Sequence, residues 1–284
     1  MEVQGVSLKG NIIDGKLLAE RINQETCKII KEKKILAGLA AILVGNDKAS
    51  ELYVTLKERA CERAEIDFHL YKFDESQTDS EIIEVIKFLN QDPDIDAILV
   101  QLPLPEKFDE KEIIKAMDPK KDVDGFHPEN ILKLQARKPE ILSPLALGID
   151  AMIQETKIKL ENKKITILSN SEIFAEPFKF LYAKHNQVTG TNLKDPDHKE
   201  KCHEADILIV AIGNPKYITN EFVKDQAVVI DVGINDLGDE TVGDVDFHNV
   251  MLKAGYITPV PGGVGPLTIA YLLKNTIRLA ENHQ

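Results

Sequence analysis

Five short apolar segments, each rich in Ile, Val and Leu, recur along the chain and constrain its fold more than any other feature. Each is bounded by Gly, Asn, Asp or Pro, and together they lack the regular apolar–polar alternation of half-exposed strands. They therefore predict strands of parallel sheets, which are buried on both faces. Segments between them, such as 80–90, carry apolar residues at three- and four-residue intervals and are typical of crossover helices. The predicted strands are 39–45, 95–102, 164–169, 205–213 and 226–233.

The order of these segments predicts an α/β protein with two domains. A chain of 284 residues is long enough for two domains of roughly 100 to 200 residues each. The Lys- and Pro-containing stretch 133–150 interrupts the alternation of strands and helices, so we place the boundary at residue 147. The first domain then covers 1–147, and the second, with a parallel sheet, covers 148–266. On pattern alone, the last helix, predicted for 267–282, could return to either domain.

The charge balance excludes some classes of partner. Acidic residues outnumber basic ones by 47 to 35, which gives a net charge of -12. An acidic surface repels nucleic acid and anionic lipid, so we expect neither as a partner. No apolar run approaches the roughly 20 residues that span a bilayer, and residues 1–10 lack the basic start and apolar middle of a signal peptide. We therefore expect a cytoplasmic protein that does not bind membranes.

The cysteines and histidines do not predict a metal site. Cys27, Cys61 and Cys202 are widely separated and lack C-x-x-C spacing, so they predict neither a disulfide framework nor a zinc site. The seven histidines form no H-E-x-x-H or comparable cluster. We expect no metal.

A helix predicted for 46–66 offers the first candidate site. Its buried face is expected to carry Leu52, Leu56 and Ala60, at four-residue steps. An adjacent face carries three polar residues three and four positions apart, and a Tyr beside a Lys at that spacing can offer a hydroxyl, an aromatic plane and an amine to one substrate. The alternative is a solvated Lys beside a packed Tyr. The three polar residues are Ser50, Tyr53 and Lys57.

Three further segments are candidate ligand-binding loops. Gln101 stands at the carboxyl end of a predicted buried strand, where open parallel sheets bind ligands, although an ordinary strand end followed by a turn would look the same. The loop 121–128 does not match a calcium loop, and its Asp124 could bind the amide-like edge of a heterocycle. The loop 259–266 holds three glycines, which permit close backbone approach to a ligand.

In this order and at these distances, the segments resemble the bifunctional methylenetetrahydrofolate dehydrogenase (NADP)/methenyltetrahydrofolate cyclohydrolase family, the FolD proteins. No single motif carries the resemblance, but the joint order covers nearly the whole chain. The matching segments are VGNDKASELYVTLKERAC, AILVQLPLPEKF, PKKDVDGFHPENILKL, ADILIVAIGNPKYI, AVVIDVGIN, VGDVDF and ITPVPGGVGPLTIAYLLKNT.

The resemblance implies an N-terminal folate-binding catalytic domain and a C-terminal Rossmann-type NADP-binding domain, with the folate in the cleft between them. The last helix, 267–284, would pack back on the N-terminal domain. A homodimer, a folate substrate, no metal, and a role in one-carbon metabolism and purine biosynthesis are also implied.

The resemblance further assigns site residues. It makes Lys57 the principal catalytic residue, held by Gln101 and accompanied by Tyr53, while Asp124 binds the pteridine ring. Further substrate-binding residues would be Ser50, Leu102, Pro261, Gly262 and Gly263, and the cofactor-binding residues would be Ser169, Asn170, Ser171 and Ile234.

The phosphate-binding turn departs from the family pattern. The family has Gly-Arg-Ser after the first strand of the second domain and another Gly before x-Pro, whereas this chain has Ser169, Asn170, Ser171 and then Ala175. A side chain at the first position obstructs backbone approach to phosphate, and Asn170 cannot supply the charge that favours a 2′-phosphate. Glu176 would add repulsion if it pointed inward.

Two other segments depart in the same region. Residues 143–146 replace the family's Pro-Cys-Thr-Pro, and 188–197 replaces a segment with Cys-His-Ser by one of acidic, loop-like composition. We therefore weigh three hypotheses. The first is a cyclohydrolase that converts 5,10-methenyltetrahydrofolate to 10-formyltetrahydrofolate, with its dehydrogenase activity weak, absent or shifted to another cofactor. The second is a fully bifunctional enzyme that uses NADP or NAD, and the third is a folate- or partner-binding protein without catalysis.

Overall fold

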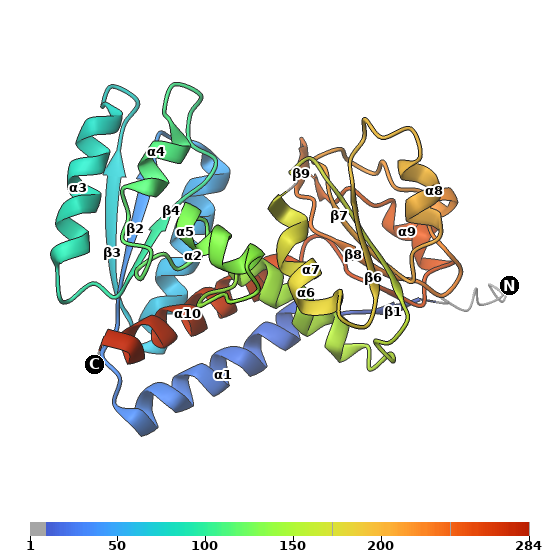
Figure 1. Ribbon diagram of the computed structural model, residues 1–284, viewed down its shortest axis with the longest axis horizontal. Helices are drawn as coiled ribbons and strands as arrows, with labels where there is room; N and C mark the ends of the chain where they lie inside the picture. The colour runs from blue at the N-terminus through green and yellow to red at the C-terminus, as the bar shows by residue number, and fades with distance from the viewer. Residues whose placement is uncertain (1–9, 172, 239, 284) are drawn as a thin grey trace, which may run out of the picture. The chain divides into compact units, whose positions relative to one another are not determined.

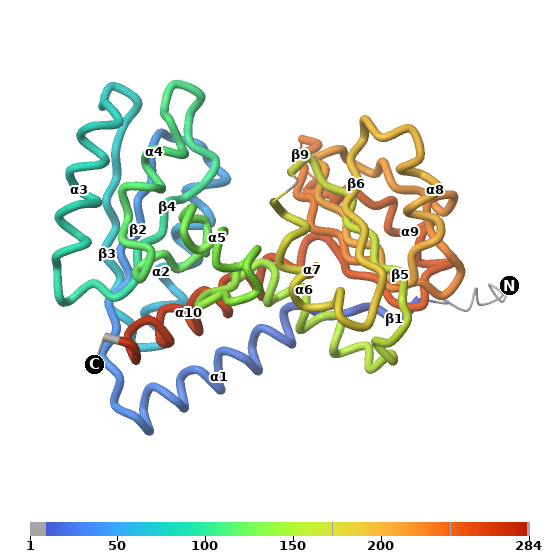
Figure 2. The backbone as a smooth tube through the Cα atoms, in the orientation of Figure 1, coloured from blue at the N-terminus to red at the C-terminus, as the bar shows by residue number. Residues whose placement is uncertain are grey.

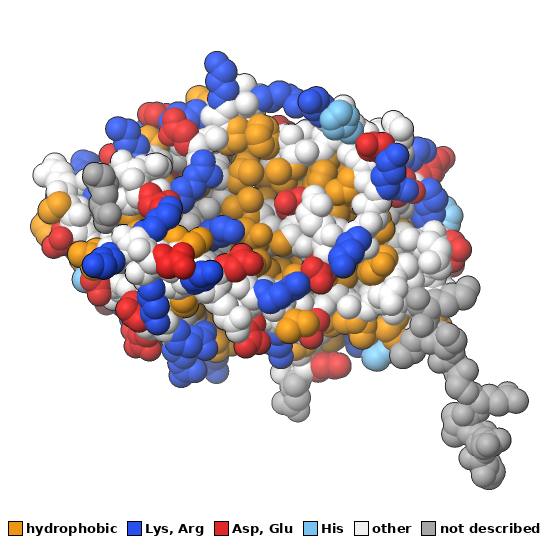
Figure 3. Space-filling view, turned by 90° about the horizontal axis from the view of Figure 1, so that it is seen from below, with side chains coloured by type: hydrophobic (Ala, Val, Ile, Leu, Met, Phe, Trp, Pro, Cys, Tyr) orange, Lys and Arg blue, Asp and Glu red, His pale blue; other side chains and the backbone are white. Residues whose placement is uncertain are grey.

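The computed structural model describes residues 10–171, 173–238 and 240–283 and divides the chain into two compact units (Figures 1 and 2). The three-stranded unit comprises Ala19–Pro144 and Thr268–Gln284, and the six-stranded unit comprises Met1–Leu18 and Leu145–Leu267. The N-terminal segment 1–9, on which the signal-peptide expectation rests, lies outside the described residues. Among the described helices, none is long and apolar enough to cross a membrane. Side chains of both charges are interspersed on the face shown in Figure 3.

The three-stranded unit is built on a parallel sheet in the order β3-β2-β4, with β2 in the centre. Every residue of β2 is buried, as expected for a central strand covered on both faces. Because successive side chains point to opposite faces, Leu39 and Ala41 belong to one apolar core while Ala40 and Ile42 belong to another. The elements that lie wholly or mostly in this unit are α1 (Gly15–Lys33), β2 (Gly38–Val44), α2 (Lys48–Ala64), β3 (Asp67–Phe73), α3 (Asp79–Gln91), β4 (Ala97–Val100), α4 (Glu110–Lys115), α5 (Pro128–Gln135) and α10 (Val264–His283).

The six-stranded unit is a parallel sheet in the order β1-β11-β8-β7-β5-β6. From β5 the chain moves outward to β6, then crosses back to β7 on the other side of β5, so the strand order reverses between β5 and β7. In doubly wound sheets this reversal opens the crevice that binds ligands. The elements are β1 (Asn11–Ile12), α6 (Pro144–Glu155), β5 (Lys164–Ser169), α7 (Glu176–Tyr182), β6 (Gln187–Thr191), α8 (His198–His203), β7 (Ile207–Ala211), β8 (Val228–Asp231), β9 (Asn235–Leu237), β10 (Glu240–Val242), α9 (Phe247–Met251) and β11 (Tyr256–Ile257).

The α/β class is confirmed, and each of the five predicted strands overlaps an observed one. The sequence pattern missed β3 because its residues, DFHLYKF, form a sheet edge that is mostly open to solvent and therefore carries polar side chains. It also gave 188–197 a loop-like character, whereas the first residues of that segment form β6. The predicted domain boundary at 147 falls within α6, and the division by contacts falls between Pro144 and Leu145.

The predicted buried face of the helix 46–66 is wrong. Leu52 and Leu56 are 58% and 38% exposed, and only Ala60 of that set is buried. The helix instead buries its small and polar face, which includes Ser50 and Lys57. Leu52 and Leu56, at a four-residue step, therefore mark the outer side of α2, because its inner side carries small and polar residues.

Helix α3 provides a test of the core of the three-stranded unit. A capping box between Thr78 and Glu81 starts the helix, and Ile86 is fully buried against the sheet. Replacing Ile86 by Ala should lower the free energy of unfolding of this unit by about 2 to 5 kcal/mol, through lost burial and the cavity that remains. Urea denaturation measures this, with Phe88→Ala as the control, since Phe88 is 63% exposed on the same helix. Equal effects of the two substitutions would contradict the described packing.

Candidate active site

The buried amine of Lys57 is the centre of the candidate site in the three-stranded unit. Helix α2 starts at a cap in which the Asp47 side chain accepts a hydrogen bond from Ser50 N, and it directs Lys57 inward two turns later. The side chain of Lys57 is 8% exposed. Its Nζ donates to Gln101 Oε1 at 2.8 Å. Burial without such a partner would be costly for an ammonium group.

Gln101 connects this amine to the end of the sheet. Its backbone N donates to Ile42 O at 2.9 Å, which extends the β2–β4 pairing by one residue beyond β4. Its side-chain Nε2 donates to Leu102 O at 2.7 Å, so the amide orientation is fixed and the oxygen faces Lys57. The carboxyl end of a buried strand thus holds the partner of the buried amine.

The loop that carries Asp124 is held by a neighbouring carboxylate. Asp122 is buried and accepts hydrogen bonds from Gly125 N at 2.9 Å, His127 N at 2.8 Å and Asn130 Nδ2 at 2.9 Å. Gly125 has a φ of 75°, a conformation that favours glycine. Asp122 therefore sets the turn that places Asp124.

The last helix also anchors this loop. Asn275 of α10 is buried, and its Nδ2 donates to Val123 O at 3.0 Å and to Leu142 O at 2.9 Å. Neither Asp122 nor Asn275 was predicted from the sequence. Asp122 lay in the segment that drew attention to Asp124, but its role depends on the folded turn, and Asn275 lies 152 positions away from its acceptor.

Lys57 and Asp124 each shift toward the neutral form. Burial lowers the pKa of Lys57, and the electrostatic attraction of Asp124 opposes that shift. Burial raises the pKa of Asp124 to about 6, with Lys57 opposing the shift and Asp122 adding to it. The structure therefore brings together Lys57, Gln101 and Asp124, and both ionisable groups become able to exchange a proton closer to neutrality.

The other predicted residues of this unit lie on the same elements. Tyr53 is half-buried one turn before Lys57, and burial raises the pKa of its hydroxyl. Ser50 is buried in the first turn of α2. Leu102, half-buried, follows Gln101 and packs against the core beside β4.

The cofactor residues predicted in the six-stranded unit lie at the carboxyl ends of the strands. Ser169 ends β5 beside Ala211 of β7, at the reversal of strand order. Asn170 connects the ends of β5 and β7, because its N donates to Ala211 O at 3.4 Å and its Nδ2 donates to Ile212 O at 2.6 Å. Ser171 N donates to Ser169 Oγ at 3.0 Å. The polar groups of the turn are thus largely satisfied by the chain itself.

Two further positions and one loop of the six-stranded unit's sequence were also singled out. Glu176 forms an ion pair with Lys179 at 2.7 Å, so its charge is partly offset on the first turn of α7. Ile234 is 51% exposed and lies just before β9. The loop with Pro261, Gly262 and Gly263 closes on its own chain: a Cβ at Gly263 would lie 2.5 Å from Pro259 O. The need for glycine there has a structural cause, and a role of the loop in binding a ligand stays a prediction.

A pair of buried carboxylates organises the neighbouring strand ends and was missed in the sequence. Asp244 accepts from the backbone N of Ile212, Gly213 and Asn214, at 2.7, 3.1 and 2.8 Å. Asp231 accepts from the backbone N of Asp244 at 3.0 Å, and burial raises the pKa of Asp231 to about 7. The segments DVGIN and VGDVDF thus fold into one network at the ends of β7 and β8.

In the described part of the chain, no three or more His, Cys, Asp and Glu side chains are grouped to hold a metal ion. The strand order, the turn after β5 and the buried Lys57–Gln101 pair define an α/β protein with a nucleotide-type sheet in one unit and a polar site in the other. Comparison with known proteins gives the family. Residues 13–124 match the tetrahydrofolate dehydrogenase/cyclohydrolase catalytic domain, and residues 143–284 match the NAD(P)-binding domain of the same family.

Individual relatives agree over nearly the whole length. The Bifunctional protein FolD of Nautilia profundicola is 44% identical over 276 residues, which cover 95% of this chain and 97% of the relative. The crystal structure of the bifunctional enzyme FolD from Campylobacter jejuni has a TM-score of 0.91 and 38% identity, covering 96% of this chain and 99% of that one. The Trypanosoma brucei FolD structure, complexed with NADP and an inhibitor, has a TM-score of 0.90 and 30% identity, covering 96% and 98%. The chain belongs to the tetrahydrofolate dehydrogenase/cyclohydrolase family, and the predicted family resemblance is confirmed.

The coupling between Lys57 and Asp124 can be measured directly. We expect the carboxyl carbon of Asp124 to titrate near pH 6 in a ¹³C NMR experiment on the protein. Replacing Lys57 by Met removes the positive charge that favours the carboxylate, so the pKa of Asp124 should rise further. Lys48→Met, at the exposed start of α2, should leave this titration unchanged. A normal Asp124 pKa in the unmodified protein would contradict the described burial.

Proposed function

We propose that this protein is an enzyme of one-carbon metabolism that hydrolyses 5,10-methenyltetrahydrofolate to 10-formyltetrahydrofolate. The observation that carries the proposal is the hydrogen bond of buried Lys57 to Gln101, with Asp124 acting on the same amine. A protein that only bound folate would not need an amine with a lowered pKa at this position. This hypothesis therefore takes precedence over a non-catalytic role.

Lys57 is proposed to transfer the protons of the reaction. The methenyl carbon is already electrophilic, so water can add to it once a base accepts a proton from that water. Ring opening then moves a proton from the new hydroxyl group to the departing ring nitrogen. A lysine that exchanges protons closer to neutrality suits both transfers, with Gln101 orienting its amine. The reaction consumes water and releases one proton.

Asp124 and its neighbours are proposed to bind the pteridine ring. A carboxylate accepts hydrogen bonds from the donor edge of such a heterocycle. Support comes from two hydrogen bonds on either side of Asp124, which fix the backbone around it: Gly125 N donates to Asp122 Oδ1, and Asn275 Nδ2 donates to Val123 O. Tyr53, Ser50 and Leu102 are proposed to complete the binding surface.

We further propose that the protein oxidises 5,10-methylenetetrahydrofolate with a nicotinamide dinucleotide, as a bifunctional enzyme. The dinucleotide would accept the hydride that leaves the methylene carbon. Support comes from the match of residues 143–284 to an NAD(P)-binding domain and from relatives that are named as bifunctional proteins. The residues at the strand ends fit this group in part: Ser169, Asn170, Ser171 and Ile234 lie at the expected edge, but the turn contributes no cation.

Substitution of Lys57 tests the hydrolytic role. Lys57→Met should lower the kcat of methenyl hydrolysis by roughly 10²- to 10⁴-fold, the usual worth of a positioned acid–base group. Lys57→Arg keeps the charge but cannot release a proton in proteins, so it should be nearly as inactive. Full activity of Lys57→Arg would show that a positive charge alone suffices for catalysis and would refute the proton-transfer role. Lys48→Met on the exposed start of α2 is the control.

A homodimer in the cytoplasm is also proposed, following the family resemblance. The three-stranded unit offers an apolar surface that a second copy could cover: Leu70 of the edge strand β3 is 42% exposed, and Leu52 and Leu56 of α2 are exposed as well. An ion pair between Lys72 and Glu51, at 2.6 Å, connects β3 and α2.

We expect Leu56→Glu combined with Leu70→Asp to convert a dimer to a monomer in analytical ultracentrifugation, because both charges would be desolvated at the interface. Leu252→Glu, an equally exposed leucine in the six-stranded unit, is the control. A monomeric unmodified protein would refute the proposed dimer, and a dimer unaffected by the double substitution would refute this surface.

A further inference from the structure

The charge at the carboxyl end of β6 indicates which dinucleotide this chain accepts. In doubly wound sheets, the region after the second strand meets the adenosine ribose: a carboxylate there binds the 2′-hydroxyl of NAD, and an arginine accommodates the 2′-phosphate of NADP. Strand β6 follows β5 and α7 and is that second strand. Its last residue, Thr191, pairs with Leu168, one position before the turn at Ser169.

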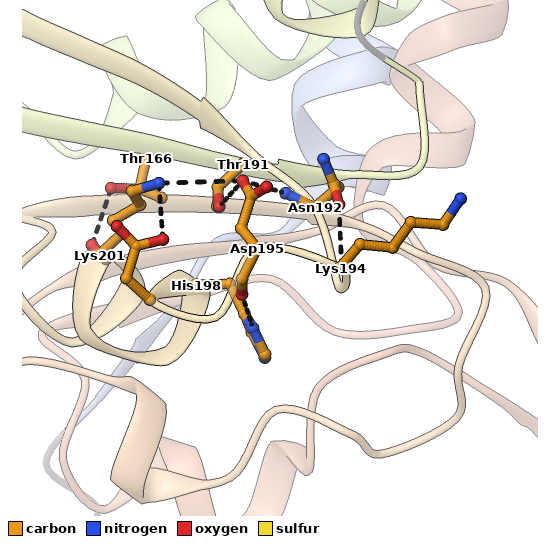
Figure 4. A network of polar contacts seen from close by, with 8 residues as sticks. Thr166, Thr191, Asn192, Lys194, Asp195, His198 and Lys201 are labelled. Carbon is orange, nitrogen blue, oxygen red and sulfur yellow. Dashed lines mark hydrogen bonds and ion pairs between the residues drawn. The ribbon is translucent and has the colours of Figure 1, made fainter.

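The loop after β6 places the carboxylate of Asp195 at this strand end (Figure 4). Asp195 Oδ2 accepts a hydrogen bond from Thr191 Oγ1 at 2.7 Å and from Asn192 N at 3.3 Å. His198 fixes the loop from the other side, because its Nδ1 lies 2.7 Å from Asp195 O. The hydrogen bonds from Thr191 and Asn192 hold the pKa of Asp195 below its ordinary value, so the group is charged at neutral pH. A carboxylate has about four acceptor positions, and these two bonds leave room for a ribose hydroxyl.

The nearby cations do not reverse this charge. Lys201 lies 3.8 Å from Asp195 Oδ2 but 2.8 Å from Asp197 Oδ1, so it is shared between two carboxylates. The side chain of Lys194 extends away from Asp195 in Figure 4, although its backbone N donates to Asn192 Oδ1 at 2.9 Å. The loop therefore presents a fixed negative charge on the strand end itself.

The turn after β5 supplies no positive charge to compensate for the negative charge of Asp195. Asn170, at the position where the family pattern has arginine, donates its side-chain amide to Ile212 O at 2.6 Å. Its backbone N donates to Ala211 O at 3.4 Å. A neutral amide that is already engaged gives a 2′-phosphate neither charge nor a bidentate donor.

We propose that the protein selects NAD over NADP, with Asp195 accepting a hydrogen bond from the adenosine 2′-hydroxyl and excluding the 2′-phosphate. The inference rests on the proposed dehydrogenase activity and names the cofactor of that same site. Asn170 contributes by leaving the phosphorylated cofactor without a counter-charge.

Equilibrium binding of the two cofactors to the full chain tests the selection without depending on turnover. We expect isothermal titration calorimetry at one fixed ionic strength to give NAD⁺ a dissociation constant at least roughly tenfold below that of NADP⁺, since a lost charge-assisted contact usually changes affinity by that much. The ionic strength is held constant because salt screens the repulsion. Equal affinities, or tighter binding of NADP⁺, would overturn the inference.

Two substitutions locate the cause. Asn170→Arg should tighten NADP⁺ binding at least roughly tenfold and change NAD⁺ binding little, because the guanidinium supplies the missing counter-charge. Asp195→Asn should bring the two dissociation constants together, with its melting temperature checked for folding. Asp197→Asn, on the same loop, is the matched control and should keep the selection. If the ratio of the NAD⁺ and NADP⁺ dissociation constants in both Asn170→Arg and Asp195→Asn equalled that of the unmodified protein, the proposed roles of the two residues would be refuted.

Lys194→Ala tests the competing role of the remaining lysine. We expect Lys194→Ala to leave the ratio of the NAD⁺ and NADP⁺ dissociation constants unchanged. A large selective loss of NADP⁺ binding would instead show that Lys194 pairs with the 2′-phosphate. Methenyl hydrolysis is measured on the same preparations, since it needs no dinucleotide. Absence of binding by both cofactors with hydrolysis intact would refute the proposed dehydrogenase activity together with this inference, whereas binding of both cofactors without a preference for NAD⁺ would overturn this inference alone. Absence of hydrolysis would instead refute the proposed hydrolytic function.

Discussion

The site of the three-stranded unit depends on keeping an ammonium group out of water. Lys57 is almost fully buried, and a buried ammonium is tolerated only when a hydrogen-bond acceptor and a compensating charge are fixed nearby. Gln101 and Asp124 meet those needs from two different segments. Two features of the unit hold these partners: the β2–β4 pairing positions Gln101, and the Asp122 turn positions Asp124.

The parts of this arrangement differ in how far they could be predicted from the sequence. The α/β class followed from apolar runs that are buried on both faces, and such runs are a local property. Lys57, Gln101 and Asp124 were selected from their positions at a helix and at strand or loop ends, with the family resemblance adding their roles, and the structure brings them together. Asp122, Asn275 and Asp244 escaped because what they do depends on backbone groups that only the fold brings near.

The error on α2 has the same origin. A helix that faces a polar site inverts the usual pattern, since its inner side carries Ser50 and Lys57 while Leu52 and Leu56 stay outside. The spacing of apolar residues identifies a helix but does not show which of its sides is buried. The edge strand β3 was missed for a related reason, because exposure removes the apolar signature on which strand prediction relies.

The contribution of α10 to the three-stranded unit has a consequence for how the protein is made. Leu272, Leu273 and Ile277 of this helix belong to the core that also contains residues of β2, and Asn275 holds the loop beside Asp124. A ribosome releases these residues only after the entire six-stranded unit has been synthesised. During translation the N-terminal segments therefore emerge well before the helix that completes their core. The native arrangement around Lys57 can form only after α10 has been translated, so premature termination within α10 would remove this arrangement although Lys57, Gln101 and Asp124 had all been translated.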